Sequence, residues 1–410
     1  MPIKTLFVDD EVALLDQAER FINKKDPGIE VFTAPSAEQG LQIFEEEDID
    51  VIVSDYYMPG MNGVEFLKKV REDGYDTPFI ILTGKGKEEV AMNAMNNGAD
   101  GYLKKEGEPQ MMYDLLVEAI HKEYDRWNIE RELEDYRKKI EELHRVASKL
   151  ISCSEEEDAY SLTMEAAEKI LNYDYCGISE AVEGVFRKRA ITSNLDPENL
   201  SERPIEDGGI DRDTWMNKEK FLIDDINESD RANPVIQDHD FRSLISLPID
   251  DIGVFQAISN EPGYFDDNDM KMCELLVSHL SNAIKRIKAK KELERKEKLY
   301  RKIFETTGSA MALIDDGMKI SLANDKFHRL FGFFDKDLGG KDFLELVVNQ
   351  DESRVEKYCE ELKEENDSFP VQFDMQITTR RDKEKHVLVT LGYSEEVNKF
   401  VLSLFEHPNR

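Results

Sequence analysis

Five polar residues within the first 105 positions have the types and the spacing that phosphoryl transfer requires. Asp9 and Asp10 directly follow a short apolar run, and Asp55 ends another such run. Thr83 and Lys105 stand at the ends of two later runs. In open parallel sheets, ligands bind outside the carboxyl ends of the strands, where the strand order reverses. We therefore expect these five side chains to share one shallow pocket.

The chemistry of such a pocket follows from its charges. Three carboxylates repel one another, so the pocket needs a cation, and oxygen ligands with retained waters favour Mg²⁺. The metal neutralises an incoming phosphoryl group, to whose oxygens the Thr83 hydroxyl and the Lys105 ammonium can donate. These groups can form an acyl phosphate on Asp55. Capping of strand ends would explain one aspartate, but not five ordered groups.

The elements that must position these residues alternate regularly along the chain. Strands are expected at 4–8, 29–33, 51–55, 79–83 and 101–103. Helices are expected at 12–24, 37–46, 64–72, 88–97 and 110–122. Five strands alternating with five helices predict a parallel sheet covered on both faces. With a flavodoxin-like strand order, the first and third strands are adjacent.

Residues 1–122 resemble the receiver domain of two-component response regulators. The resemblance is carried by LFVDDE at 6–11, VIVSDYYMPGMNG at 51–63, PFIILTG at 78–84 and GADGYLKK at 98–105. It implies that a partner sensor histidine kinase donates the phosphoryl group to Asp55.

The same resemblance implies roles for further residues. Mg²⁺ would be held by Asp9, Asp10, Asp55 and the backbone carbonyl of Tyr57. Thr83 and Tyr102 would move together as a switch couple and remodel the face around the fourth helix and fifth strand.

Two positions of this stretch affect the expected chemistry. Glu106 follows Lys105 where the family usually has a cis proline, and a cis bond before a residue other than proline costs roughly 2.5–4 kcal/mol. A trans bond with a looser lysine is therefore favoured over a strained cis bond. Tyr57 is bulky, and we expect it to hinder attacking water and lengthen the phosphoryl lifetime.

A heptad seam follows the receiver-like stretch. Its apolar positions alternate by four and three residues and are Ile129, Leu133, Tyr136, Ile140, Leu143, Ala147 and Leu150. The intervening residues are mostly charged, which is typical of a parallel coiled coil. The seam predicts a homodimer through the 129–150 helix, and the alternative is a single amphipathic helix packed on its own domain.

Two further modules are indicated downstream. Residues 148–287 resemble a GAF domain, through SLISLPIDDIGVFQAIS at 243–259 and GYFDDNDMKMCELLVSHLSNAI at 263–284. Some GAF domains bind cyclic nucleotides, linear tetrapyrroles or haem. The candidates for anchoring such a group are Cys176, Cys273, His239 and His279, although lone Cys and His residues more often serve packing.

Residues 298–406 resemble a PAS domain, through IFETTGSAMALIDDGMKISLANDKFHRLFGF at 303–333. Phe304, Phe327, Leu330 and Phe331 recur at helical spacing, which favours core positions over a cofactor box. The fold class is therefore multidomain α/β and α+β. The expected parts are a receiver at 1–122, a coiled-coil linker at 123–150, a GAF-like domain at 151–287, a helical connector at 288–300 and a PAS-like domain at 301–410.

Composition limits the class of function. The net charge of −34 repels nucleic-acid backbones, so DNA binding would need a local basic patch such as 285–302, where acidic residues are interleaved. The four cysteines are scattered singly, without zinc or disulfide spacing. No run reaches the roughly 18 apolar residues that span a bilayer, and the first residues do not form a secretion signal. A cytoplasmic protein without membrane contact is expected.

Three functions are compatible with these features. The favoured one is a response regulator that signals through its GAF and PAS modules to downstream protein partners. The second is a transcription regulator that binds DNA through an unrecognised surface. The third is a sensory regulatory subunit with a small ligand in the GAF or PAS unit. None of the seven histidines lies in a kinase context, so no enzyme activity beyond handling its own phosphoryl group is expected.

Overall fold

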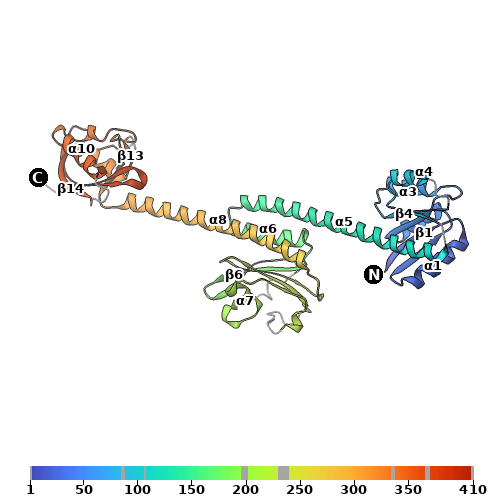
Figure 1. Cartoon of the computed structure of the whole chain (residues 1–410). Helices are drawn as coiled ribbons and strands as arrows, with labels where there is room; N and C mark the ends of the chain where they lie inside the picture. The colour runs from blue at the N-terminus through green and yellow to red at the C-terminus, as the bar shows by residue number, and fades with distance from the viewer. Residues whose placement is uncertain are drawn as a thin grey trace. The chain divides into compact units, whose positions relative to one another are not determined.

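The computed structural model describes residues 2–84, 88–105, 108–194, 202–229, 240–333, 338–364 and 370–407. The chain divides into two compact units, Met1–Ser152 with Tyr160–Leu280, and Cys153–Ala159 with Ser281–Arg410. The described residues form three sheets, two in the first unit and one in the second (Figure 1). The predicted fold class is confirmed.

The first sheet is parallel and has the order β2-β1-β3-β4-β5. Its strands are β1 Ile3–Val8, β2 Ile29–Ala34, β3 Val51–Asp55, β4 Phe79–Thr83 and β5 Gly101–Lys104. The helices around it are α1 Val12–Lys25, α2 Ala37–Glu46, α3 Gly63–Glu72, α4 Glu88–Asn96 and the first part of α5 Pro109–Ser152. Side chains of α1 and α5 cover one face, and those of α2, α3 and α4 cover the other. The central strands are therefore apolar throughout, as burial on both faces requires.

The heptad seam on α5 divides into two parts. Leu143, Ala147 and Leu150 are buried within the chain, whereas Ile129 and Leu133 are 63% and 65% exposed. The prediction of one continuous coiled-coil seam over 129–150 is therefore wrong for its last part. The alternative of a helix packed on its own domain holds there, because the same apolar spacing suits either kind of burial.

The second sheet is antiparallel, with the order β8-β7-β6-β11-β10-β9. Its strands are β6 Tyr175–Val182, β7 Val185–Ile191, β8 Arg203–Pro204, β9 Phe221–Ile223, β10 Ser243–Ile249 and β11 Gly253–Ser259. The accompanying helices are α6 Glu156–Lys169, η2 Ile205–Asp207, α7 Ile210–Asn217, η3 Ile226–Glu228 and α8 Asp267–Thr306. The carboxylate of Asp266 accepts hydrogen bonds from the backbone N–H groups of Asn268 and Asp269, so it caps α8 as its acidic first residues predict.

The third sheet, in the second unit, is antiparallel with the order β13-β12-β16-β15-β14. Its strands are β12 Ala310–Ile314, β13 Ile320–Ala323, β14 Val371–Thr378, β15 Glu384–Ser394 and β16 Lys399–Glu406. Its helices are α9 Asp325–Phe331, η4 Leu344–Leu346, α10 Asn349–Glu364 and η5 Glu395–Val397. Phe327, Leu330 and Phe331 lie in the core as predicted, but Phe304 is only half-buried near the end of α8.

Candidate phosphoacceptor site

The acidic residues of the first sheet converge because β1 and β3 are neighbours. Their register pairs Val8 with Ser54, so the next residues, Asp9 and Asp55, come to lie side by side at the carboxyl edge. Asp9 is 0% exposed and Asp55 is 6% exposed. Two carboxylates are thus held together away from bulk water, where their mutual repulsion is strong.

Lys105 supplies the positive charge at this edge. Its ammonium contacts Asp9 Oδ2 at 2.5 Å and also pairs with Asp55 Oδ1. The backbone places the lysine, because its N–H donates to the carbonyl of Thr83 at 2.8 Å across the β4–β5 edge. One cation therefore bridges two carboxylates that come from different strands.

Burial and charge act against each other in this cluster. Burial lowers the pKa of Lys105, but hydrogen bonds and charge from Asp55 and Asp9 together outweigh it and raise that pKa. Burial raises the pKa of Asp55, and Lys105 counteracts this. The lysine therefore stays protonated at neutral pH and remains the counter-ion of the acidic pair.

The loop after β3 shapes the other side of the site. The backbone N–H of Tyr57 donates to Asp55 Oδ2 at 2.8 Å, and the Ser54 hydroxyl donates to the Asp55 carbonyl at 3.0 Å. A Cβ atom at Gly63 would lie 2.3 Å from the Asp55 carbonyl oxygen, so only glycine permits this close return of the chain. These backbone contacts were missed by the sequence analysis, because residue types do not reveal them. The glycine in MNGVEF, just before a helix, was the available signal.

The start of α3 is fixed by a capping box. The Asn62 side chain accepts from the N–H groups of Val64 and Glu65, and the Glu65 carboxylate accepts from the Asn62 N–H. This arrangement satisfies the first amides of the helix and fixes the direction in which the loop enters it. The site loop is therefore held at both ends, by Asp55 and by Asn62.

The remaining predicted residues lie around this cluster. Thr83 is buried at the end of β4, and Asp10 is exposed beside Asp9. Tyr102 is half-buried on β5 and packs against the core that faces α2, α3 and α4. The Tyr57 side chain is 54% exposed. Glu106 lies outside the described residues, so the trans Lys105–Glu106 peptide bond stays a prediction.

The carboxylates at this edge of the sheet suit a divalent cation. Asp9 and Asp55 provide closely spaced, buried carboxylates, and Mg²⁺ commonly takes one or two carboxylates and keeps several waters. Within the described ranges, no group of three or more His, Cys, Asp or Glu side chains is gathered around one possible metal position. Asp10 lies exposed beside this pair. The residues therefore fit a hydrated Mg²⁺, not a fully protein-enclosed metal.

Among the residues that the structure describes, the candidates in the second module form no group of three or more potential metal ligands. Cys176 and Cys273 are fully buried, and burial raises the pKa of both thiols. His279 is half-buried, and its pKa is lowered by burial and by His144, whose ring lies 6.2 Å away. His239 falls outside the described residues. The buried thiols stay protonated and behave as core residues.

Comparisons with known proteins agree with this organisation. A family model for the response regulator receiver domain matches residues 5–117, a GAF domain model matches 153–285, and a PAS fold model matches 298–399. No helix within the described ranges combines the length and the apolar character needed to cross a bilayer.

Individual relatives match the first part of the chain. The nitrate/nitrite response regulator protein NarL of Escherichia coli (strain K12) is 37% identical over 120 residues, which are 29% of this chain and 54% of NarL. Response regulator SaeR of Staphylococcus aureus (strain USA300) is 34% identical over 105 residues, covering 26% of this chain and 45% of SaeR. The chain thus spans about half the length of the curated relatives it matches.

Among solved structures, a response regulator receiver domain from Clostridium thermocellum is similar to the same region. It is 34% identical, covers 31% of this chain and 97% of its own, and has a TM-score of 0.28. The family models, in the order in which they match, identify the parts of the molecule. This chain contains a response regulator receiver domain, followed by a GAF domain and a PAS domain.

Proposed function

We propose that this protein is a response regulator of a two-component phosphorelay, in which Asp55 accepts a phosphoryl group from a sensor histidine kinase. The observation that carries the proposal is the bridging of Asp9 and Asp55 by the Lys105 ammonium. A buried acidic pair with one mobile cation suits a site that receives a further anion. Handling of its own phosphoryl group is the only chemistry we assign to the chain, and a cytoplasmic location is part of the proposal.

The residues have distinct roles in the transfer. A carboxylate oxygen of Asp55 attacks the phosphorus, the bond to the kinase histidine nitrogen breaks, and the imidazole keeps the bonding electron pair. Asp9, Asp10, Asp55 and the Tyr57 carbonyl would hold Mg²⁺, which would neutralise charge on the phosphoryl oxygens. Lys105 turns from the acidic pair to the new anion, and Thr83 donates from its hydroxyl.

The test is phosphorylation of the full chain by a small acyl-phosphate donor and by sensor kinases, with Mg²⁺ present. Intact-mass spectrometry should show one added phosphoryl group, lost on treatment with hydroxylamine, which cleaves acyl phosphates. Asp55→Asn should abolish the addition. Asp16→Asn, at an exposed position of α1 outside the site, is the matched control. Unchanged labelling of the Asp55 variant would contradict the proposal.

Helix α5 can transmit the structural change caused by phosphorylation out of the receiver domain. Asp100, just before β5, accepts from Arg71 at 2.9 Å and from Arg126 of α5 at 2.8 Å. Arg126 also pairs with Glu123 at 2.9 Å, and the Glu123 side chain is only 3% exposed. These pairs fix residues 123–126, in the fifth turn of α5, to the sheet that carries Asp55, so a change in the sheet is passed to the helix.

The exposed part of the α5 seam is the proposed homodimer surface. Ile129 and Leu133 are large apolar residues with about two thirds of their surface in solvent, 63% and 65%. Parallel association of two α5 helices would cover them at heptad positions. Leu143 and Ala147 are buried, so cysteines introduced to cross-link the two copies belong at Ile129 and Leu133.

We predict that Ile129→Glu with Leu133→Glu converts a dimer into a monomer, because the glutamates would face each other across the seam. Light scattering after size-exclusion chromatography measures the mass. The matched control is Glu130→Gln with Glu134→Gln, on the same exposed turns but off the seam. An unchanged mass in the seam variant would place the dimer contact elsewhere.

Direct DNA binding is the less favoured alternative. The basic residues of 285–302 are interleaved with acids, and several are paired at N–O distances of 2.6 to 3.7 Å: Lys291 with Glu155, Lys288 with Glu156, Arg301 with Glu297 and Lys296 with Glu292. Such pairing reduces the charge available for phosphates. We therefore propose protein partners at the GAF and PAS modules as the output.

A further inference from the structure

The PAS module has a filled interior. Phe327, Phe331, Leu338 and Phe343 are each 0% exposed in the core between the sheet and its helices. Large apolar side chains thus occupy the centre of this module. A groove on its outside, by contrast, has space for a ligand.

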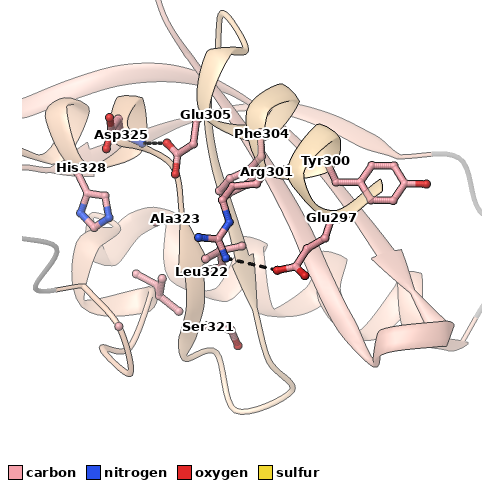
Figure 2. A pocket seen from close by; sticks show the side chains of 12 residues that line it. Glu297, Tyr300, Arg301, Phe304, Glu305, Ser321, Leu322, Ala323, Asp325 and His328 are labelled. Atoms are coloured by element: carbon pink, nitrogen blue, oxygen red, sulfur yellow. Dashed lines mark hydrogen bonds and ion pairs between the residues drawn. The ribbon is translucent and has the colours of Figure 1, made fainter. Parts of the chain in front are cut away.

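This groove lies between the last turns of α8, strand β13 and the start of α9, with a volume of about 650 Å³ (Figure 2). Its walls are tied together at one end. The Asn324 side-chain amide donates to the Phe304 carbonyl at 2.9 Å, and the Glu305 carboxylate accepts from the Asp325 N–H at 3.0 Å. The volume falls within the range of small-molecule sites, roughly 300–1,000 Å³. The groove is therefore largely preformed.

The lining of the groove is apolar on its floor and acidic on its rim. Leu322, which is 51% exposed, forms the floor with Ala323 and Phe304. Charged side chains approach from α8 and α9 (Figure 2), and they are Glu297, Glu305, Asp325 and Arg301, with His328 beside them. Three carboxylates against one guanidinium favour a cation in the groove, and an anion would be repelled.

The single guanidinium is weakly held. Arg301 pairs with Glu297 at 3.6 Å, and the two side chains are 77% and 69% exposed. Exposed pairs of this kind contribute about 0–1 kcal/mol. Another cation can therefore replace Arg301 beside Glu297 at little cost.

We propose that this groove binds a small amphipathic amine, whose apolar body lies on Leu322 and Phe304 and whose ammonium pairs with the acidic rim. Glu297 and Asp325 are the charge partners, because Glu305 already accepts the Asp325 N–H. Such a ligand would bridge the end of α8 and strand β13. It would stiffen this junction independently of events at Asp55.

The experiment uses the full chain with 1-naphthylmethylamine, and with 1-naphthylacetate as the anion of matched size. Saturation-transfer NMR and equilibrium dialysis measure binding. The amine should bind at least about ten-fold more tightly than the carboxylate, which corresponds to one favourable charge contact. Equal binding of both probes, or no binding of the amine, would overturn the proposal.

Variants test the position of the ligand. Leu322→Lys should weaken amine binding at least about ten-fold, because it places a cation on the apolar floor. Leu299→Lys is the matched control, since Leu299 is a 53% exposed leucine of α8 outside the lining. Glu297→Gln with Asp325→Asn should remove the preference for the amine over the carboxylate. Equal effects of Leu322→Lys and Leu299→Lys would overturn the assignment.

A second copy of the chain is the competing occupant. Light scattering on the wild type and on Leu322→Lys separates the two cases. Unchanged mass together with lost amine binding supports the ligand site. A fall in mass in the Leu322 variant alone would show that another copy covers the groove, and would overturn the proposal.

Discussion

Asp55 and Asn324 are both buried polar residues next to a strand end, but their surroundings differ in kind. Asn324 is 0% exposed, and its side chain uses its full hydrogen-bonding capacity. The amide oxygen accepts from two backbone N–H groups and the amide nitrogen donates to two carbonyls, at distances of 2.9 to 3.1 Å; the partners are Met311, Phe327, Phe304 and Ser309. Asn324 therefore joins β12, α8 and α9 and has no capacity left for a ligand.

Among the described residues, the Asp55 carboxylate accepts one backbone hydrogen bond, from the Tyr57 N–H, and it also pairs with a charged side chain from a distant part of the chain. It shares the Lys105 ammonium with Asp9, so neither carboxylate has a cation of its own. A buried polar group satisfied by backbone alone is architectural. One that is balanced by a mobile charge can exchange partners, and this is the property that chemistry needs.

The largest expected effect is the loss of folding stability when Asn324 is replaced. Asn324→Leu leaves four backbone groups unsatisfied, and it should destabilise the PAS module by about 4 kcal/mol. Hydrogen–deuterium exchange with mass spectrometry should show lost protection in β12 and α9. Asn349→Leu, at an exposed position of α10, is the control.

Phosphorylation of Asp55 should be unchanged by Asn324→Leu. A slower reaction in this variant would mean that the architectural residue also supports the chemistry, and the contrast between the two residues would fail.

The second prediction concerns the mobile charge. Lys105→Met leaves Asp9 and Asp55 without a counter-ion, which should destabilise the receiver domain by about 3 kcal/mol in a chelator. If the proposed magnesium site is correct, added Mg²⁺ should restore much of this loss, because a metal that binds only the folded state stabilises it. Thermal unfolding in chelator measures the loss of stability, and thermal unfolding in magnesium measures its recovery. Lys104→Met, at the exposed preceding residue, should change neither.

The raised pKa of Lys105 gives the pH dependence of this contribution. The ion pair stabilises the fold fully below the ordinary lysine pKa and loses this effect as the pH rises through the raised value. The wild type and Lys105→Met should thus differ in stability at neutral pH and converge at strongly alkaline pH. A constant difference would assign the effect to packing of the lysine stem.

The smallest expected effect concerns access of water to the modified aspartate. Tyr57→Asn should speed loss of the phosphoryl group by about three-fold, less than 1 kcal/mol of barrier, because the exposed ring no longer hinders water. The decay of the phosphorylated mass gives the rate. Tyr75→Asn, a 49% exposed tyrosine of the same domain, is the control. An unchanged lifetime would show that the ring of Tyr57 does not shield the site.

Much of the fold could be predicted from the sequence, because strand ends coincide with changes in residue type. Strands β3 and β4 begin and end at the predicted residues, 51–55 and 79–83. The meeting of Asp9, Asp55 and Lys105 followed from strand order alone. The helix α7 was missed, since its eight residues follow two glycines and carry little apolar periodicity.

Other features depend on what covers a side chain, which spacing does not reveal. Ile129 and Leu143 occupy equivalent heptad positions, but one is 63% exposed and the other 1%. Phe304 has the spacing of a core residue, but it lines an outer groove. The approach of Gly63 to the Asp55 carbonyl is a backbone contact, and its only signal in the sequence is a glycine at the start of a helix.

The ammonium shared by Asp9 and Asp55 also affects how the newly synthesised protein folds. A newly synthesised chain carries its own counter-ion, so the receiver domain can fold before any metal arrives. If the proposed function is correct, magnesium supply would then set the rate of phosphorylation and would not affect the amount of protein that folds.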